Sequence, residues 1–415
     1  MIKVDKQIPI KVMQTKKFKT ITLSIFFKSP MDKSRAASRH LLSKMMIKRT
    51  SRFNREMALL DFLSEYYGAH LTSTTFKRGS DHVVRISLEF VNDKFILEEL
   101  DILNRMIELF KDILDSPSAY NEDTQSFFDK ELRLYKNRLN NYLDHKEQKS
   151  FIQMMNMMFE NHPMRIPSYG TLENIESLTL DSVKTEYDRL INNDEAAIVI
   201  VGDVDAEVEE KLSNLLARDK KVELTNRSYT FEDAVEVKNG TATMDVEQAK
   251  LNIGFTIKTE NKIDRINLSA VNQMFGGSVN AFLFRNVREH LSLAYQIFSS
   301  LDARNGFLHV SAGVDIKNVD TAASAILDEL ERIRSGNFND DFLEEIKLMM
   351  RVNRKETEDG PKGLTGILYN QLIAGKVTDY EELLTHVTRE RVMDVARRLS
   401  LNTVHVLTGG KSNEN

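Results

Sequence analysis

Hydrophobic positions along the chain follow two alternating periods. Apolar, β-branched and aromatic runs predict strands, whereas apolar residues spaced three or four apart predict amphipathic helices. The first strand candidate is "TITLSIFF" (residues 20–27), and helical patterns follow at residues 34–48 and 54–67. The first half continues with two paired strand candidates, three helices and a buried strand: "GAHLTSTT", "DHVVRISLEF", residues 97–114, 122–143 and 181–190, and "AAIVIVGDVD" (residues 196–205).

The same order of elements recurs in the second half. Its strand candidates are "AKLNIGFTI", "LAYQIFSSLD", "GFLHVSAGV" and "TVHVLTG", and its helical patterns are residues 263–274, "NAFLFRNVREH", "TAASAILDELERIRSG" and "DDFLEEIKLMMRVNR". The closest local match sets "FDKELRL" (residues 128–134) beside "FLEEIKL" (residues 342–348). An internal repeat of this length predicts two like-folded α+β domains, each a mixed or antiparallel sheet with helices packed on one side.

The repeat also predicts domain boundaries. We expect an N-terminal domain over residues 1–217, a polar linker over 218–239 and a C-terminal domain over 240–415. "FIQMMNMMFENHPM" (residues 151–164) has many methionines at helical spacing. Two interpretations stay open for it: core packing of a helix, or a flexible surface for variable peptides.

Composition narrows the class of protein. The 415 residues carry a net charge of −5 with both signs plentiful, which does not indicate nucleic-acid binding. There is no cysteine, so disulfides, thiolate metal sites and cysteine nucleophiles are excluded. We find no apolar signal segment, and the longest apolar runs are far below the roughly 20 residues of a membrane helix. A cytoplasmic protein without a nucleic-acid or membrane partner is expected.

One stretch almost spells a metal motif. "RHLLSKMM" (residues 39–46) begins like the H-x-x-E-H helix of inverted zinc peptidases, in which two histidines share a helix face and a glutamate acts as general base. His40 is the first histidine, but Ser43 and Lys44 stand where the glutamate and second histidine should be. Serine is too weak a base, and a charged lysine repels Zn²⁺. The sequence therefore predicts no metal in this chain, and His40 is interpreted as an ordinary helix histidine.

A second stretch, "FRNVREHLSLAYQI", contains an arginine and a tyrosine that are candidates for a functional site. Arg288 lies near the end of a predicted helix, and Tyr295 lies at the start of the next strand. Taken alone, the pair has an ordinary interpretation: an ion pair for the arginine and simple packing for the tyrosine.

Residues 10–410 resemble the insulinase/pitrilysin-like zinc peptidases in their short, two-domain form. The resemblance rests on the repeat, on "ASRHLLSKMM" at the position of the metal helix, and on "YYGAHLTSTT", "HPMRIPSYG", "VEQAKLNIGF" and "VREHLSLAY". It implies that Arg288 and Tyr295 bind the substrate carbonyl near a zinc ion, where both would stabilise an oxyanion. It also places the third metal ligand seven residues beyond Glu131, at Arg138, so that position too lacks an acid.

The resemblance implies a non-catalytic subunit. The expected partner is a homologous subunit with an intact H-x-x-E-H motif and Zn²⁺, and the two would enclose a chamber for peptides such as leader peptides. This chain would then be inactive alone. The alternatives are a scaffold or peptide-binding protein of the same fold with no protease partner, and a homodimer of the isolated chain.

Overall fold

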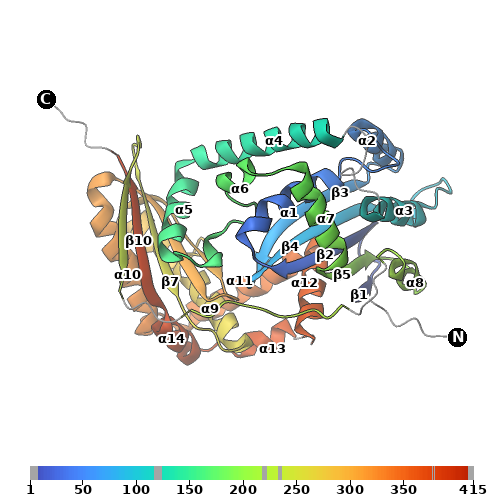
Figure 1. The fold of residues 1–415 in the computed structure, drawn as a ribbon. Coiled ribbons are helices and arrows are strands. Elements are labelled where there is room, and N and C mark those ends of the chain that lie inside the picture. The colour runs from blue at the N-terminus through green and yellow to red at the C-terminus, as the bar shows by residue number, and fades with distance from the viewer. Residues whose placement is uncertain are drawn as a thin grey trace. The chain divides into compact units, whose positions relative to one another are not determined.

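Two five-stranded sheets organise the computed structural model, which describes residues 8–115, 124–216, 222–231, 236–375, 377 and 379–409 (Figure 1). The first sheet has the order β1-β5-β2-β4-β3 and the second the order β6-β10-β7-β9-β8. The strands of the first sheet are β1 (Ile10–Gln14), β2 (Thr20–Pro30), β3 (His70–Arg78), β4 (Asp81–Val91) and β5 (Glu195–Gly202). Those of the second are β6 (Lys238–Thr243), β7 (Ala249–Thr256), β8 (Ala294–Asp302), β9 (Phe307–Val314) and β10 (Ser400–Thr408).

The two sheets repeat one topology. In each, the outer pair (β1 with β5, β6 with β10) is parallel and the other pairs are antiparallel. The predicted α+β class with mixed sheets, and the repeat behind it, are therefore confirmed. Strand β6 begins at Lys238, inside the stretch predicted to be a linker, and neither β1 nor β6 was predicted.

Helices occur in both halves of the chain. Those before the second sheet are α1 (Lys33–Met46), α2 (Glu56–Glu65), α3 (Ile102–Asp115), α4 (Thr124–Asp144), α5 (Lys146–Met158), α6 (Leu172–Glu176), α7 (Leu180–Asn192) and α8 (Val208–Ser213). Those after its first strands are α9 (Lys262–Phe275), the π-helix η4 (Leu283–His290), α10 (Val319–Arg334), α11 (Asp340–Asp359), α12 (Pro361–Ala374), α13 (Tyr380–Thr385) and α14 (Arg389–Arg398). Short 3₁₀ turns are η1 (Asp93–Phe95), η3 (Pro163–Arg165) and η5 (Ile316–Asn318). None of the described helices is long and apolar enough to cross a membrane.

Spatial contacts divide the chain into two compact units that exchange segments. Unit 1 comprises Met1–Leu139, Ile166–Arg227 and Glu356–Val377, and unit 2 comprises Asn140–Arg165, Ser228–Lys355 and Thr378–Asn415. Helix α5 thus packs on the second sheet, and α12 packs on the first. The predicted boundaries at residues 217 and 240 follow the sequence repeat. The two units are instead defined by spatial contacts, so the boundaries stay a prediction.

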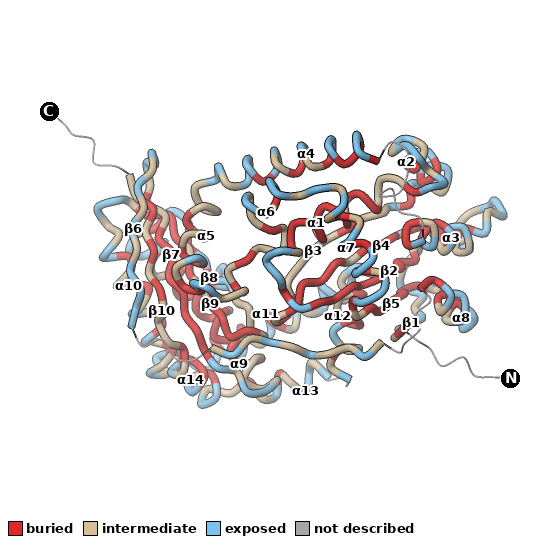
Figure 2. Tube along the Cα trace, in the orientation of Figure 1, coloured by how far each residue is buried: buried red, intermediate tan, exposed pale blue. Residues whose placement is uncertain are grey.

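Helices cover both faces of each sheet, so the expectation of helices on one side only is wrong. Side chains alternate between faces along a strand, yet almost all of β2 is buried (Figure 2). On one face Phe26 stacks on Tyr369 of α12, with ring centroids 4.0 Å apart. In unit 2, Met154 and Met158 of α5 are buried and pack over Gly254 of β7. The core-packing interpretation of the methionine-rich segment is therefore correct for its helical part.

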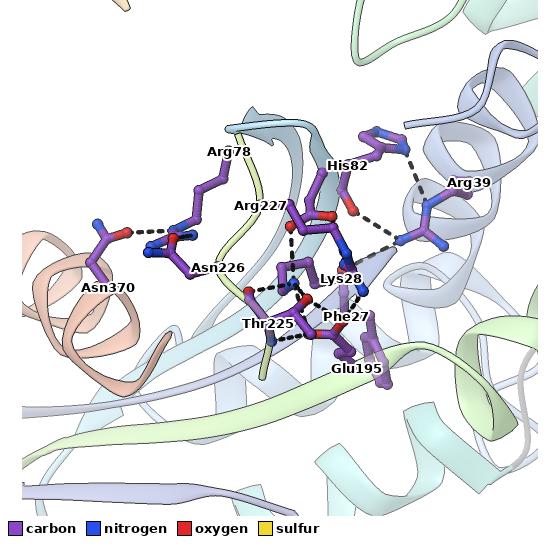
Figure 3. Close-up of polar contacts among 11 residues, drawn as sticks. Phe27, Lys28, Arg39, Arg78, His82, Glu195, Thr225, Asn226, Arg227 and Asn370 are labelled. Carbon is purple, nitrogen blue, oxygen red and sulfur yellow. Dashed lines mark hydrogen bonds and ion pairs between the residues drawn. The ribbon is translucent and has the colours of Figure 1, made fainter. Parts of the chain in front are cut away.

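Part of the predicted linker is anchored by a buried ionic network in unit 1 (Figure 3). The amine of Lys28 lies 2.9 Å from an Asp81 oxygen and 2.7 Å from a Glu195 oxygen. It also donates to the hydroxyl and carbonyl oxygens of Thr225, while Arg227 pairs with both carboxylates. Each buried charge has an opposite partner, which offsets part of its desolvation cost.

Candidate functional site

Helix α1 carries the incomplete metal motif, and the residue before that motif fixes the helix in place. Arg39 is only 1% exposed. Its guanidinium pairs with Glu186 at 3.0 Å and also with Asp194, and it donates to Nδ1 of His82 at 3.1 Å. Figure 3 shows the contacts of Arg39 with His82 and with the Phe27 carbonyl. These contacts anchor helix α1 at Arg39, and thereby fix the position of the next residue, His40.

The motif side chains bond to the protein itself. The His40 ring lies 2.7 Å, Nδ1 to Oγ1, from Thr75 on the edge strand β3. Ser43 is buried and donates to the carbonyl of His40 at 2.8 Å. The Lys44 amine donates to the carbonyl of Ser73 at 2.5 Å. All three side chains are thus held by neighbouring residues.

The surroundings of His40 disfavour both a protonated imidazole and a bound metal cation. Burial, together with the positive charges of Lys44 and Arg138, lowers the pKa of His40 to about 4. Burial and the charges of Arg138 and Lys48 also lower the pKa of Lys44. Arg138 is exposed on α4, at the position that the resemblance assigns to the third ligand. One imidazole beside two cationic side chains does not fit Zn²⁺, which requires several neutral or anionic donors.

Metal content gives a direct check of this chemistry. We expect the purified chain, dialysed against excess Zn²⁺ and then desalted, to hold much less than one equivalent of zinc by elemental analysis. His40→Ala should leave that content unchanged. One tightly bound zinc per chain that disappears in His40→Ala would contradict the assignment. Among the described residues, no group of three histidine or acidic side chains forms a candidate metal cluster.

The second candidate pair lies in unit 2, where the backbone departs from regular geometry. Arg288 belongs to the π-helix η4, and its guanidinium carbon lies 4.5 Å from the ring centroid of Phe284. Ser292, between η4 and β8, has a φ of 52°, in the left-handed region. Strand β8 then carries a bulge, because Ala294 pairs with Val314 and Gln296 with Gly313, which leaves Tyr295 extra. Such irregularities are common at functional sites and re-aim side chains.

Tyr295 projects into solvent with one polar partner. Its side chain is 58% exposed, and its hydroxyl donates to a carboxylate oxygen of Asp315 at 3.2 Å. The hydrogen bond and charge of Asp315 raise the pKa of Tyr295. A tyrosine is already protonated at neutral pH, and this shift leaves the phenol able to donate. Arg288 is exposed as well.

The structure places the predicted residues in two sets. His40, Ser43, Lys44 and Arg138 belong to unit 1, and Arg288 and Tyr295 belong to unit 2. Their roles stay predictions. Sequence reasoning missed three contributors: Arg39, Thr75 and Asp315. No sequence signal could have found Thr75 or Asp315, because each is a common residue whose partner lies 20 or more positions away.

These features define a class: a fold of two units with like sheets, in which helix α1 carries an incomplete H-x-x-E-H motif. A family model described as "Peptidase M16 inactive domain" matches residues 177–350. A relative named "probable inactive metalloprotease YmfF" from Bacillus subtilis (strain 168) is 28% identical over 404 residues, which is 96% of this chain and 95% of the relative. The chain is thus similar to the M16 peptidases, the insulinase/pitrilysin-like family, and to proteins described as inactive in that group.

Solved structures share the whole fold. A conserved protein from Enterococcus faecalis V583 superposes with a TM-score of 0.89 at 26% identity and covers 99% of both chains. A peptidase M16 inactive domain from Pseudomonas fluorescens superposes with a TM-score of 0.79, covering 99% of this chain and 98% of its own. At 14% identity, the second likeness concerns the fold alone.

Proposed function

We propose that this chain is the non-catalytic subunit of a heterodimeric zinc metallopeptidase of the cytoplasm. It forms half of a closed chamber and contributes Arg288 and Tyr295 to peptide substrates. The homologous partner subunit carries H-x-x-E-H and Zn²⁺, and with the metal it supplies the activation of water. The substrates are peptides or leader peptides that can enter a closed chamber.

One observation carries this proposal: unit 1 holds an incomplete zinc motif, whereas unit 2 presents the exposed side chains of Arg288 and Tyr295. The side chains of Arg288 and Tyr295 are both exposed to solvent. An ordinary core role would bury them, and a purely structural arginine would pair with an acid. A guanidinium and a phenol that both donate hydrogen bonds suit the oxyanion that develops as water attacks a peptide carbonyl.

The hydrogen bond of Tyr295 to Asp315 adds a physical condition. A phenol has one proton, which here points to the Asp315 carboxylate. A substrate oxyanion must replace that carboxylate as the acceptor. The exchange costs little, because the tyrosine is exposed and water competes for the same bond. Asp315 raises the pKa of the phenol further above neutral pH, so the proton stays available for a substrate acceptor.

Complex formation is the first test. The chain and a homologous subunit with intact H-x-x-E-H, encoded in the same genome, are mixed and analysed by size exclusion with light scattering. We expect a 1:1 complex, and its absence at micromolar concentrations would contradict the proposal. The rival function, a scaffold or peptide-binding protein without a protease partner, predicts that no such subunit is encoded nearby and that none binds. Light scattering of the isolated chain also shows whether it forms a homodimer.

A further inference from the structure

One partly buried arginine on the first sheet has no acidic partner. Arg85 lies on β4, between β2 and the edge strand β3. Its Nε atom is buried without a hydrogen-bond partner, and within the described part of the chain its guanidinium forms no ion pair. Burial lowers the pKa of Arg85, but an arginine stays charged at neutral pH. Buried polar groups normally have partners, so this exception requires an explanation.

The acids of β4 on the same sheet face bond to other residues. Alternate residues of a strand share a face, so Arg85 shares its face with Asp81 and Glu89. Asp81 pairs with Lys28 at 2.9 Å, and Glu89 accepts a hydrogen bond from the hydroxyl of Thr20 at 3.1 Å. Both acids lie four residues from Arg85, which is about 13 Å along an extended strand. Arg85 therefore carries a charge that its own strand does not neutralise.

The strand register places an unpartnered hydroxyl beside Arg85. Thr74 of β3 is the direct cross-strand neighbour of Arg85, so the two side chains share a face, and their Cβ atoms lie about 4.5–5.5 Å apart. Oγ1 of Thr74 is buried and has no hydrogen-bond partner among the described residues. Thr72 on the same face differs, because its hydroxyl donates to the carbonyl of Ser87 at 3.4 Å. Arg85 and Thr74 are thus two neighbouring donors without an acceptor.

We propose that Arg85 and Thr74 form an anion site that binds a carboxylate of a peptide. The guanidinium offers five N–H donors in a planar fork, which matches the two oxygens of a carboxylate, and the hydroxyl adds one more donor. Both residues are partly exposed, so a ligand can reach them. The choice of a peptide rests on the proposed function, and its carboxylate comes from a free C-terminus or from an acidic side chain.

Stability distinguishes a ligand-binding arginine from a structural one. A partly desolvated charge without a partner costs free energy in the unliganded protein. Arg85→Met keeps most of the side-chain length and removes the charge, so it should raise the melting temperature by about 2 °C or more. Arg39→Met should lower the melting temperature instead, because buried Arg39 pairs with Glu186 and Asp194. Thermal unfolding followed by circular dichroism measures both shifts.

The binding test uses the full chain alone. Three fluorescent peptides of one sequence are compared by anisotropy at low salt: a neutral peptide with an amidated C-terminus, the same peptide with a free C-terminus, and an amidated peptide with one glutamine changed to glutamate. We expect at least one anionic peptide to bind about tenfold or more tightly than the neutral one, and the stronger of the two identifies the source of the carboxylate. Cleavage by the heterodimer is measured separately, so failure of this binding and failure of the proposed function are distinguishable.

Variants assign the binding to Arg85 and Thr74. Arg85→Met should weaken binding of the anionic peptide about tenfold or more. Arg133→Met is the matched control, because it removes the same charge from an exposed position of α4 and should leave binding unchanged. Thr74→Val should weaken binding about threefold or more, whereas Thr72→Val on the same strand face should not. Equal binding of all three peptides, equal effects of Arg85→Met and Arg133→Met, or a lowered melting temperature of Arg85→Met would overturn the proposal.

Discussion

Replacing Arg288 with alanine is expected to lower kcat/KM of the assembled heterodimer roughly 100-fold or more, the usual effect of losing one oxyanion donor. Tyr295→Phe should have an effect of similar size, because it removes the hydroxyl and leaves the ring. Both side chains are exposed, so neither change disturbs a core. The measurement is cleavage of a quenched fluorescent peptide by the complex with the zinc-bearing subunit.

Arg285 supplies the control for this experiment. It is an exposed arginine of the same π-helix, so Arg285→Ala removes an equal charge one turn away. We expect Arg285→Ala to keep nearly full activity and all variants to keep the 1:1 complex. Full activity of the double variant Arg288→Ala with Tyr295→Phe would rule out a role for the pair in catalysis.

The second large effect concerns stability rather than activity. Lys28→Met should lower the free energy of unfolding of unit 1 by about 3–5 kcal/mol. Among the described residues, it leaves buried Asp81 and partly buried Glu195 with Arg227 as their one cationic partner. Methionine keeps much of the volume of lysine, so the loss reports the missing charge. Urea denaturation followed by circular dichroism measures the shift of the transition.

Lys33→Met is the matched control for Lys28→Met. Lys33 also pairs with a carboxylate, that of Glu173, but the two side chains are 44% and 77% exposed. Exposed pairs contribute about 0–1 kcal/mol, so this change should be nearly silent. Equal effects of the two substitutions would mean that the network around Lys28 does not hold the segment near Thr225.

Most of the fold could be predicted from hydrophobic periodicity, and the failures have a common cause. Strands β2, β5, β7 and β10 are apolar and β-branched, and their repeated order revealed the two sheets. The exchange of α5 and α12 between units could not be predicted, because a helix pattern shows that one face is apolar but not which sheet covers it. Strand β6, "KNGTAT", is polar and was included in the linker. Its strand state comes from pairing with β10, a contact between residues far apart in sequence.

For the candidate site, the sequence identified residues but not their surroundings. His40, Ser43 and Lys44 stood out because a helical motif has fixed spacing. Their actual contacts, with Thr75 and Ser73 on β3, depend on how the helix packs against the sheet edge. The bulge that exposes Tyr295 is likewise a property of two paired strands. Such pairing leaves no mark in the sequence of one strand alone.

In the proposed function, this chain completes the active site of another subunit. The most direct measurement is the rate of cleavage of a quenched peptide by the zinc-bearing subunit, alone and with increasing amounts of this chain. We predict little activity for either chain alone, and a rise that saturates at one equivalent. A zinc-bearing subunit that is equally fast with and without this chain would contradict the account.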